Sequence, residues 1–332
     1  MDSPSYEEEF FGILTDDGLY LDCVFYRPPG VPDADLRAIR VWVPKVPLSK
    51  TSVMTCARHE VSAAGSKGRI AHLVFDLRGT GLSDVKDDKY ENDLAGIKLW
   101  AEERFGDINV GFYGTPTMAY GSVDMMPVRP GVVFEQYVYP ARGMPSPRTI
   151  FYLSTYGNFT EYDERLCLHL CQAGYHVIAI DPLRYLLHAG HQNLLKPEDL
   201  WSDFAALQQT FLAPPFIIAQ PIASGLGLLL AAGPTPVAGV VSVGRAQASF
   251  VPSHVFNNSN PHTFFITRYV KRISPRPAVF VLDSRSRKED TEELATLLKS
   301  SGDPKRLEKT RLITPKFLFE MIDWIKESQD AS

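Results

Sequence analysis

The fold is decided by one stretch, Phe216 to Ala232, which reads Phe-Ile-Ile-Ala-Gln-Pro-Ile-Ala-Ser-Gly-Leu-Gly-Leu-Leu-Leu-Ala-Ala. Its first four residues form a short apolar run of the kind found in strands that are buried on both faces of a sheet. Gln220 and Pro221 then make a tight turn. The residues after the turn are apolar and often small, as in a helix that packs closely on a sheet. The stretch therefore predicts a strand, a sharp turn and a helix in direct succession.

Apolar runs and helical patterns alternate along most of the chain. Strands are expected over 10–14, 19–26, 38–46, 70–75, 108–113, 134–139, 149–154, 176–180, 237–243 and 278–282, and helices over 52–64, 93–105, 162–172, 198–211, 291–300 and 315–326. Strands that alternate with helices build parallel sheets with helices on both faces. The sequence thus predicts an α/β protein with a mostly parallel, doubly wound sheet.

The second part of this pattern resembles the first. Three landmarks recur after about 105 residues: Asp76 and Asp181 each follow a strand, Pro116 and Pro221 each sit in a turn, and Phe105 and Phe211 each end a helix. An internal duplication of one β/α half explains this spacing, with residues 1–128 as the N-terminal half and 129–332 as a larger core. Coincidence between two ordinary β/α runs is the alternative, because few residues are identical between the halves.

A glycine-rich segment follows the strand expected at 70–75. Residues Asp76 to Ser83 read Asp-Leu-Arg-Gly-Thr-Gly-Leu-Ser, and two glycines in such a loop permit sharp turns. The segment resembles the D-x-R-G-x-G-x-S segment after the fourth strand of the α/β-hydrolase superfamily, where it is structural. The strand, turn and helix at 216–232 resemble the same superfamily's elbow, G-x-S-x-G, which carries the catalytic serine. The chain is accordingly identified as a divergent member of this superfamily.

The catalytic triad of that superfamily is not recognisable in this chain. In the resemblance, the place of the serine falls on Pro221 in the core and on Pro116 in the N-terminal half, and proline has no nucleophilic atom. Asp283 matches the neighbourhood of the acid, but the last histidine in the sequence is His262, so no imidazole base follows the acid. The resemblance thus implies the fold and argues against ordinary ester or amide hydrolysis.

Polar residues nevertheless follow several strands at the carboxyl edge of the predicted sheet, where ligands bind in open α/β folds. The loop that begins at Thr155 lies where the superfamily has its oxyanion hole. By position alone, the expected catalytic residues are Tyr156, Tyr185, His188 and His191. The expected substrate-binding residues are Thr155, Gly157, Asn158, Arg184, Gln220 and Ser224.

Metal and cofactor sites have weak support. His188 and His191 lack a third ligand, and Cys167 and Cys171, four residues apart on one helix, are better explained as buried thiols. The run Gly225-Leu226-Gly227 has no third glycine at the interval of a dinucleotide-binding loop. We expect no metal and no cofactor.

Composition and charge limit the classes of partner. The chain has 45% hydrophobic and 22% charged residues, with a formal net charge of −5, so neither nucleic acid nor a membrane surface is an expected partner. The acidic N-terminus does not resemble a signal peptide, and no apolar run is long enough to span a bilayer. The expected location is the cytoplasm.

Two functions remain open. In the first, the protein is a biosynthetic enzyme that acts on a carbonyl-bearing small molecule without hydrolysing it, by addition, cyclisation, isomerisation or decarboxylation, because backbone donors can stabilise an enolate without a covalent step. In the second, it is a non-catalytic pseudo-hydrolase that binds a ligand or serves in assembly, with the two related halves packed as a pseudo-dimer. The first is favoured because the polar residues gather at the ligand-binding edge, and a homo-oligomer is compatible with both.

Overall fold

The computed structural model describes residues 6–155, 159–190, 195–244, 249–250, 264–284 and 287–331, and of residues 187, 188, 190, 249 and 250 only the backbone. Two compact units divide the chain. Unit 1 comprises Met1–Ala119 and Asn158–Glu161, and unit 2 comprises Tyr120–Gly157 and Tyr162–Ser332. The sequence-based division lay between residues 128 and 129. Each unit has its own principal sheet, so each is described by itself.

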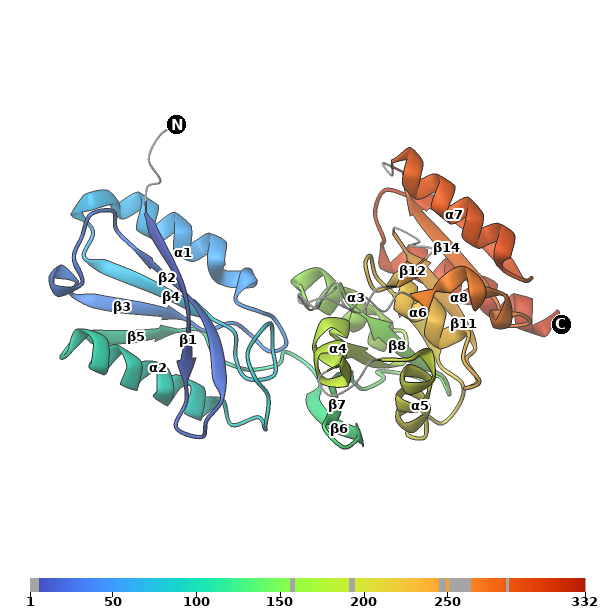
Figure 1. Cartoon of the computed structure of the whole chain (residues 1–332), viewed down its shortest axis with the longest axis horizontal. Coiled ribbons are helices and arrows are strands. Elements are labelled where there is room, and N and C mark those ends of the chain that lie inside the picture. Colours follow the sequence, from blue (N-terminus) through green and yellow to red (C-terminus); the bar gives the residue numbers. More distant parts are fainter. Residues whose placement is uncertain are drawn as a thin grey trace. The chain divides into compact units, whose positions relative to one another are not determined.

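Unit 1 is a five-stranded sheet with a helix on each face (Figure 1). Its elements are β1 (Glu7–Leu14), β2 (Tyr20–Arg27), β3 (Ala38–Trp42), α1 (Thr51–Ala64), β4 (Ile70–Phe75), α2 (Tyr90–Phe105) and β5 (Asn109–Tyr113), with short 3-10 turns at Asp33–Asp35 and Gly65–Lys67. The strands lie in the order β1-β2-β4-β3-β5. β2 is antiparallel to β1 and β4, and β3 is parallel to β4 and β5.

The alternation of side chains along β2 explains why helices cover both faces of this sheet. Val24 and Tyr26 point to one face and pack with Ala57 and Val61 of α1. Phe25 points to the other face, where its ring meets the Trp100 ring of α2 edge-on with centroids 5.7 Å apart. Successive strand residues face opposite sides, so the buried stretch of β2 from Cys23 to Tyr26 supplies core residues for both helices.

Unit 2 contains an eight-stranded sheet. Its strands are β6 (Ser122–Arg129), β7 (Val132–Tyr139), β8 (Thr149–Leu153), β9 (His176–Ile180), β10 (Phe216–Ala219), β11 (Gly239–Val243), β14 (Ala278–Asp283) and β15 (Lys305–Thr310), in the order β15-β14-β11-β10-β8-β9-β7-β6. β7 is antiparallel to both neighbours, and the other neighbouring pairs are parallel.

The remaining elements of unit 2 surround this sheet (Figure 1). They are α3 (Glu161–Gln172), α4 (Pro182–Gly190), α5 (Pro197–Gln208), α6 (Ser224–Ala231), α7 (Lys288–Ser300), α8 (Pro315–Asp330), a small pair formed by β12 (Ser249–Phe250) and β13 (Phe264–Phe265), and 3-10 turns at Ile266–Arg268 and Val270–Ile273. The predicted α/β class, with a mostly parallel and doubly wound sheet, is confirmed. No helix in the described part of the chain is long and apolar enough to cross a membrane.

The two sheets share one topology over five strands. β1 to β5 lie in the order β1-β2-β4-β3-β5, and β6 to β10 lie in the corresponding order β6-β7-β9-β8-β10. The directions match as well, since the second strand of each set is antiparallel to both neighbours and the rest are parallel. This is the arrangement that duplication of a β/α half would produce, although the duplication itself stays a prediction.

One expected feature of unit 1 is wrong. The resemblance places the serine position of an elbow, a turn between a strand and a helix, at Pro116. No helix follows it; the chain passes from β5 through irregular backbone to β6, which pairs with β7 in the sheet of unit 2. Pro116 consequently does not lie on an elbow. The correspondence between the units therefore ends at β5.

Candidate functional site

Among the described residues, the backbone is strained in the turn between β10 and α6. Ile222 has φ +74°, and it is the one non-glycine residue there with a positive φ. For a β-branched residue this conformation is a genuine outlier, and such strain costs about 1 to 3 kcal/mol and clusters at functional sites. The chain thus retains the strained geometry that lifts a catalytic serine in G-x-S-x-G elbows.

The apex of this elbow is Ile222 and not Pro221, which corrects the assignment made from sequence. The pyrrolidine ring fixes φ near −65°, so Pro221 cannot take the left-handed conformation of the apex. Ile222 takes it instead, and 46% of this residue is exposed. A branched hydrocarbon therefore occupies the position from which a nucleophile would attack.

Two glycines allow the elbow to pack tightly against its surroundings. A Cβ atom on Gly227 of α6 would lie 2.5 Å from the Cβ atom of Ala219 on β10, so the helix touches the strand through bare backbone. Gly244 follows β11 with φ +86°, and a Cβ there would lie 2.9 Å from Cγ of Pro221. α6 therefore packs closely on β10, and the residue that follows β11 packs closely on Pro221.

The carboxyl ends of the neighbouring strands meet beside the elbow. The N–H of Gln220 donates to the carbonyl of Leu153 at the end of β8 (2.9 Å). Thr155, a predicted substrate-binding residue, follows two residues later and is partly exposed. Asp283, the residue that matches the neighbourhood of the acid, is the last residue of β14 and is also partly exposed. The edge predicted to bind ligands thus carries the elbow, Thr155 and Asp283.

Gln220 and Ser224 lie on the two sides of the apex and are both buried. Nε2 of Gln220 has no hydrogen bond of normal geometry, yet the amide is close enough to the Tyr152 hydroxyl to favour its ionised form. Burial, and then the charge of Asp163, raise the pKa of Tyr152 well above its usual value, and its hydroxyl donates to Oδ1 of Asp163 (2.7 Å). Ser224 begins α6 and is fully buried.

Tyr185, a predicted catalytic residue, lies in the core of unit 2. Its ring stacks on Phe134 with centroids 4.3 Å apart, and its hydroxyl donates to Oδ2 of Asp203 (2.9 Å). Arg129 also donates to Asp203. Burial, followed by the charge of Asp203, raises the pKa of Tyr185 well above its usual value. Core packing accounts for all of these contacts.

Arg184, a predicted substrate-binding residue, precedes Tyr185 on α4. It forms an ion pair with Glu135 of β7, and both side chains are buried. α4, which carries Arg184, begins directly after β9, where Oδ1 of Asp181 accepts a hydrogen bond from the N–H of Leu183 (2.9 Å). The ion pair joins α4 to the sheet.

The other predicted site residues lie outside the description. Tyr156, Gly157, Asn158 and His191 are not among the described residues, and for His188 only the backbone, within α4, is described. Their roles stay predictions. Within the described residues, no group of three or more His, Cys, Asp or Glu side chains is arranged to hold a metal ion.

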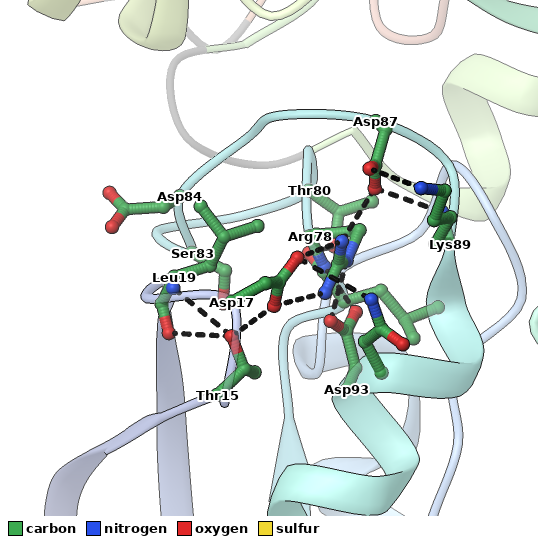
Figure 2. A network of polar contacts seen from close by, with 12 residues as sticks. Thr15, Asp17, Leu19, Arg78, Thr80, Ser83, Asp84, Asp87, Lys89 and Asp93 are labelled. Carbon is green, nitrogen blue, oxygen red and sulfur yellow. Dashed lines mark hydrogen bonds and ion pairs between the residues drawn. The ribbon is translucent and has the colours of Figure 1, made fainter.

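A separate polar cluster lies in unit 1 and is built around the glycine-rich segment from Asp76 to Ser83 (Figure 2). Arg78 is wholly buried, and its guanidinium donates to Asp93 (2.6 Å), Asp87 (2.5 Å) and Asp17 (3.0 Å). Burial raises the pKa of Asp93, whereas the hydrogen bond from Arg78 holds the pKa of Asp17 far below its usual value. These carboxylates come from α2, the loop before it and the β1–β2 turn, so Arg78 joins three segments.

A buried lysine continues this network on the other side of the segment. Lys50 donates from Nζ to Asp22 and to Asp76 (2.6 Å), and its backbone N–H also donates to Asp76 (2.6 Å). Gly81 has φ +50°, and a Cβ there would lie 2.1 Å from the Asp76 carboxylate. The contacts of the segment are therefore those of a loop anchor, in line with the structural role that the resemblance implied.

Strand order, strand direction and the strained elbow of unit 2 together define its fold. The fold is of the α/β-hydrolase type. Neither a protein-family model nor a curated protein matches the sequence. Solved structures do match it, at low sequence identity.

An esterase domain from Rhodothermus marinus matches at 15% identity and a TM-score of 0.45, covering 62% of this chain and 98% of its own. An α/β hydrolase from Sphaerobacter thermophilus matches at 13% identity and a TM-score of 0.44, covering 61% of this chain and 99% of its own. The α/β hydrolase GrgF from a Penicillium species matches at 12% identity and a TM-score of 0.30, covering 97% of this chain and 99% of its own.

Proposed function

We propose that unit 2 binds a carbonyl-bearing small molecule at the carboxyl edge of its sheet and acts on it by non-hydrolytic chemistry, namely addition, cyclisation, isomerisation or decarboxylation. The observation that carries this proposal is Ile222 at the apex of a strained elbow. An acyl-enzyme mechanism needs a nucleophile at that apex, and an isoleucine side chain supplies only apolar surface.

The backbone of the elbow supports the same proposal. In elbows of this type, the N–H of the residue after the apex is one donor of the oxyanion hole, and here that residue is Ala223. A carbonyl oxygen held by such a donor can take up the charge of an enolate without any bond to the protein. The half-exposed Ile222 side chain would contact the apolar part of the same ligand.

Proton transfer would fall to residues at the edge of the sheet. Tyr156, His188 and His191 stay the predicted candidates, because imidazole and phenol groups are suited to moving protons. Tyr185 has weaker support, because its buried hydroxyl is engaged by Asp203. Thr155, which begins the predicted oxyanion-hole loop, is partly exposed and stays a predicted substrate-binding residue.

The proposal is tested with isoleucine-methyl-labelled protein, titrated with cyclohexanone and with butyrolactone. The methyl signal of Ile222, assigned by its loss in Ile222→Val, is expected to shift saturably, whereas the signal of Ile325, buried in α8, is expected to stay in place. Absence of any shift at Ile222 rejects ligand binding at the elbow. Catalysed opening of the lactone ring rejects non-hydrolytic chemistry.

A second candidate function is assembly without catalysis. The specific observation in its favour lies in unit 1, whose sheet ends at β5 with exposed aromatic side chains. A protein that binds neither ketone nor lactone at Ile222, yet self-associates, would fit this candidate.

A further inference from the structure

β5 is an edge strand of the sheet of unit 1. It pairs with β3 on one side, and the described residues place no strand on its other side. The N–H of Val43 donates to the carbonyl of Tyr113 (2.8 Å), so the main-chain groups of Tyr113 face β3. Because these groups alternate along a strand, those of Val110 and Phe112 face away from β3. They are a template for another strand.

The strand of unit 2 that corresponds to β5 is β10, and it has a neighbouring strand on both sides. β10, the fifth strand of the shared topology, is paired with β8 on one side and with β11 on the other, and all its residues are buried. In β5, by contrast, Phe112 is 37% exposed and Tyr113 is 47% exposed. The position next to this strand is thus filled by β11 in unit 2, whereas no strand fills it in the described part of unit 1.

β5 also lacks the features by which proteins protect sheet edges, such as charges, proline and register shifts. β15 carries charged residues at 305, 306, 308 and 309. β6 contains Pro127 and a register shift, and β1 begins with glutamates. β5 reads Asn-Val-Gly-Phe-Tyr, without a charge or a proline. Among the edge strands of the two principal sheets, β5 is therefore the one suited to pairing.

We propose that β5 pairs antiparallel with β5 of a second copy of this chain, about a two-fold axis at Gly111. The register follows from the outward groups: Val110 pairs with Phe112 of the second copy, and Phe112 with Val110, each exchanging both main-chain hydrogen bonds. A two-fold arrangement closes on itself and stops at a dimer. The inference concerns a surface of unit 1 and does not depend on the function proposed for unit 2.

The two-fold register places Gly111 opposite Gly111 of the second copy, in a non-hydrogen-bonded pair, in which Cα atoms approach to about 4.5 Å. This separation allows a disulfide. The three atoms nearest to a Cβ at residue 111 all belong to the ring end of Tyr113, at 3.2 to 3.9 Å. Gly111→Cys is therefore expected to form a disulfide-linked dimer under mild oxidation. The exposed native thiol, Cys56, is removed first by Cys56→Ser.

The matched control is Asn109→Cys in the same background. In the proposed register, residue 109 lies opposite residue 113 of the second copy and far from its own counterpart, so it cannot link to itself. Cross-linking of Gly111→Cys alone supports the proposal. Equal cross-linking of both variants, or none of Gly111→Cys, overturns it.

An independent test measures the mass of the full chain by sedimentation over the micromolar range. The wild type is expected to be a dimer in equilibrium with monomer, and Phe112→Lys is expected to raise the dissociation constant about tenfold or more. Phe10→Lys, which charges an exposed phenylalanine on the opposite edge strand β1, is expected to leave it unchanged. A wild-type chain that stays monomeric, oligomers larger than a dimer, or equal effects of both variants overturn the proposal.

Discussion

A Cβ atom on Gly244 would lie 2.9 Å from Cγ of Pro221, and 3.2 Å from its Cα. The end of β11 therefore presses against the elbow through bare backbone. Gly244 also has φ +86°, which a side chain would disfavour. The elbow is thus supported from the neighbouring strand at the residue just before its apex.

Gly244→Ala is expected to destabilise unit 2 by more than the conformational cost of a positive φ, which is about 1 kcal/mol. The added methyl group meets Pro221, which is held by its ring and by the strain at Ile222. Gly143→Ala is the matched control, because Gly143 has φ +73° with no atom within 4 Å of its missing Cβ. Urea unfolding, followed by hydrogen exchange of unit 2 peptides, measures the difference. Equal losses in both variants would show that the contact with Pro221 carries no energy.

Ile222→Gly is expected to stabilise unit 2 by about 1 kcal/mol, because glycine adopts the left-handed conformation without strain. Ile222→Val, which keeps the branched Cβ, should give no such gain. Ile222 is 46% exposed, so removing its side chain gives up only part of the burial energy of a core isoleucine. The free energy of unfolding from urea titrations checks this prediction. A destabilised glycine variant would mean that the isoleucine contributes packing energy that exceeds its strain.

Asp93→Asn is expected to destabilise unit 1 by about 3 to 5 kcal/mol, the usual cost of breaking a buried ion pair from one side. Both Asp93 and Arg78 have fully buried side chains, whereas Asp87, another partner of Arg78, is 26% exposed. Asp87→Asn should therefore cost much less. Thermal unfolding of unit 1, followed by hydrogen exchange, distinguishes the two variants. Similar losses would imply that Arg78 is not as desolvated as its surroundings indicate.

Acid is expected to weaken unit 1 through His72. Burial, and then the charge of Arg40, lower the pKa of His72 to about 4 from 6.5, and Nε1 of Trp42 donates to its Nδ1 (3.0 Å). Between these pH values the unfolded chain binds the proton and the folded chain does not, so stability falls as the pH falls. The stability that unit 1 gains from the lowered pKa of His72 is fully present above pH 6.5.

The full shift of His72 corresponds to roughly 3 kcal/mol. His72→Gln keeps an acceptor for Trp42 and removes the titrating ring. Urea unfolding at several pH values between 4 and 7 should therefore show a shallower pH dependence in this variant than in the wild type. Identical slopes in this window would contradict the assignment.

The order of strands and helices was accessible from sequence because it depends on local patterns. Gly65 ends α1 at residue 64, as expected, with φ +55°, and the apolar run from Phe216 to Ala219 is the buried strand β10. The absence of a helix after β5 was not accessible, because the turn residues from Gly114 to Met118 suit an elbow and an irregular link equally well.

The site was predicted less well than the fold. The apex could have been placed correctly, since the ring of Pro221 forbids a positive φ and leaves Ile222 as the next residue to take it. The start of α4 was also signalled, because Asp181 and Pro182 form a typical helix start, which puts Arg184 and Tyr185 within a helix. The partners of these side chains, Glu135 and Asp203, are distant in sequence, and no local pattern reveals them.

The central claim is that the elbow of unit 2 holds no nucleophile. The most direct measurement is intact-protein mass spectrometry after treatment with a fluorophosphonate probe, with a serine esterase labelled in parallel. The account predicts that the mass of this protein stays unchanged while the esterase gains one probe. Stoichiometric labelling of a serine or threonine in this chain would contradict it.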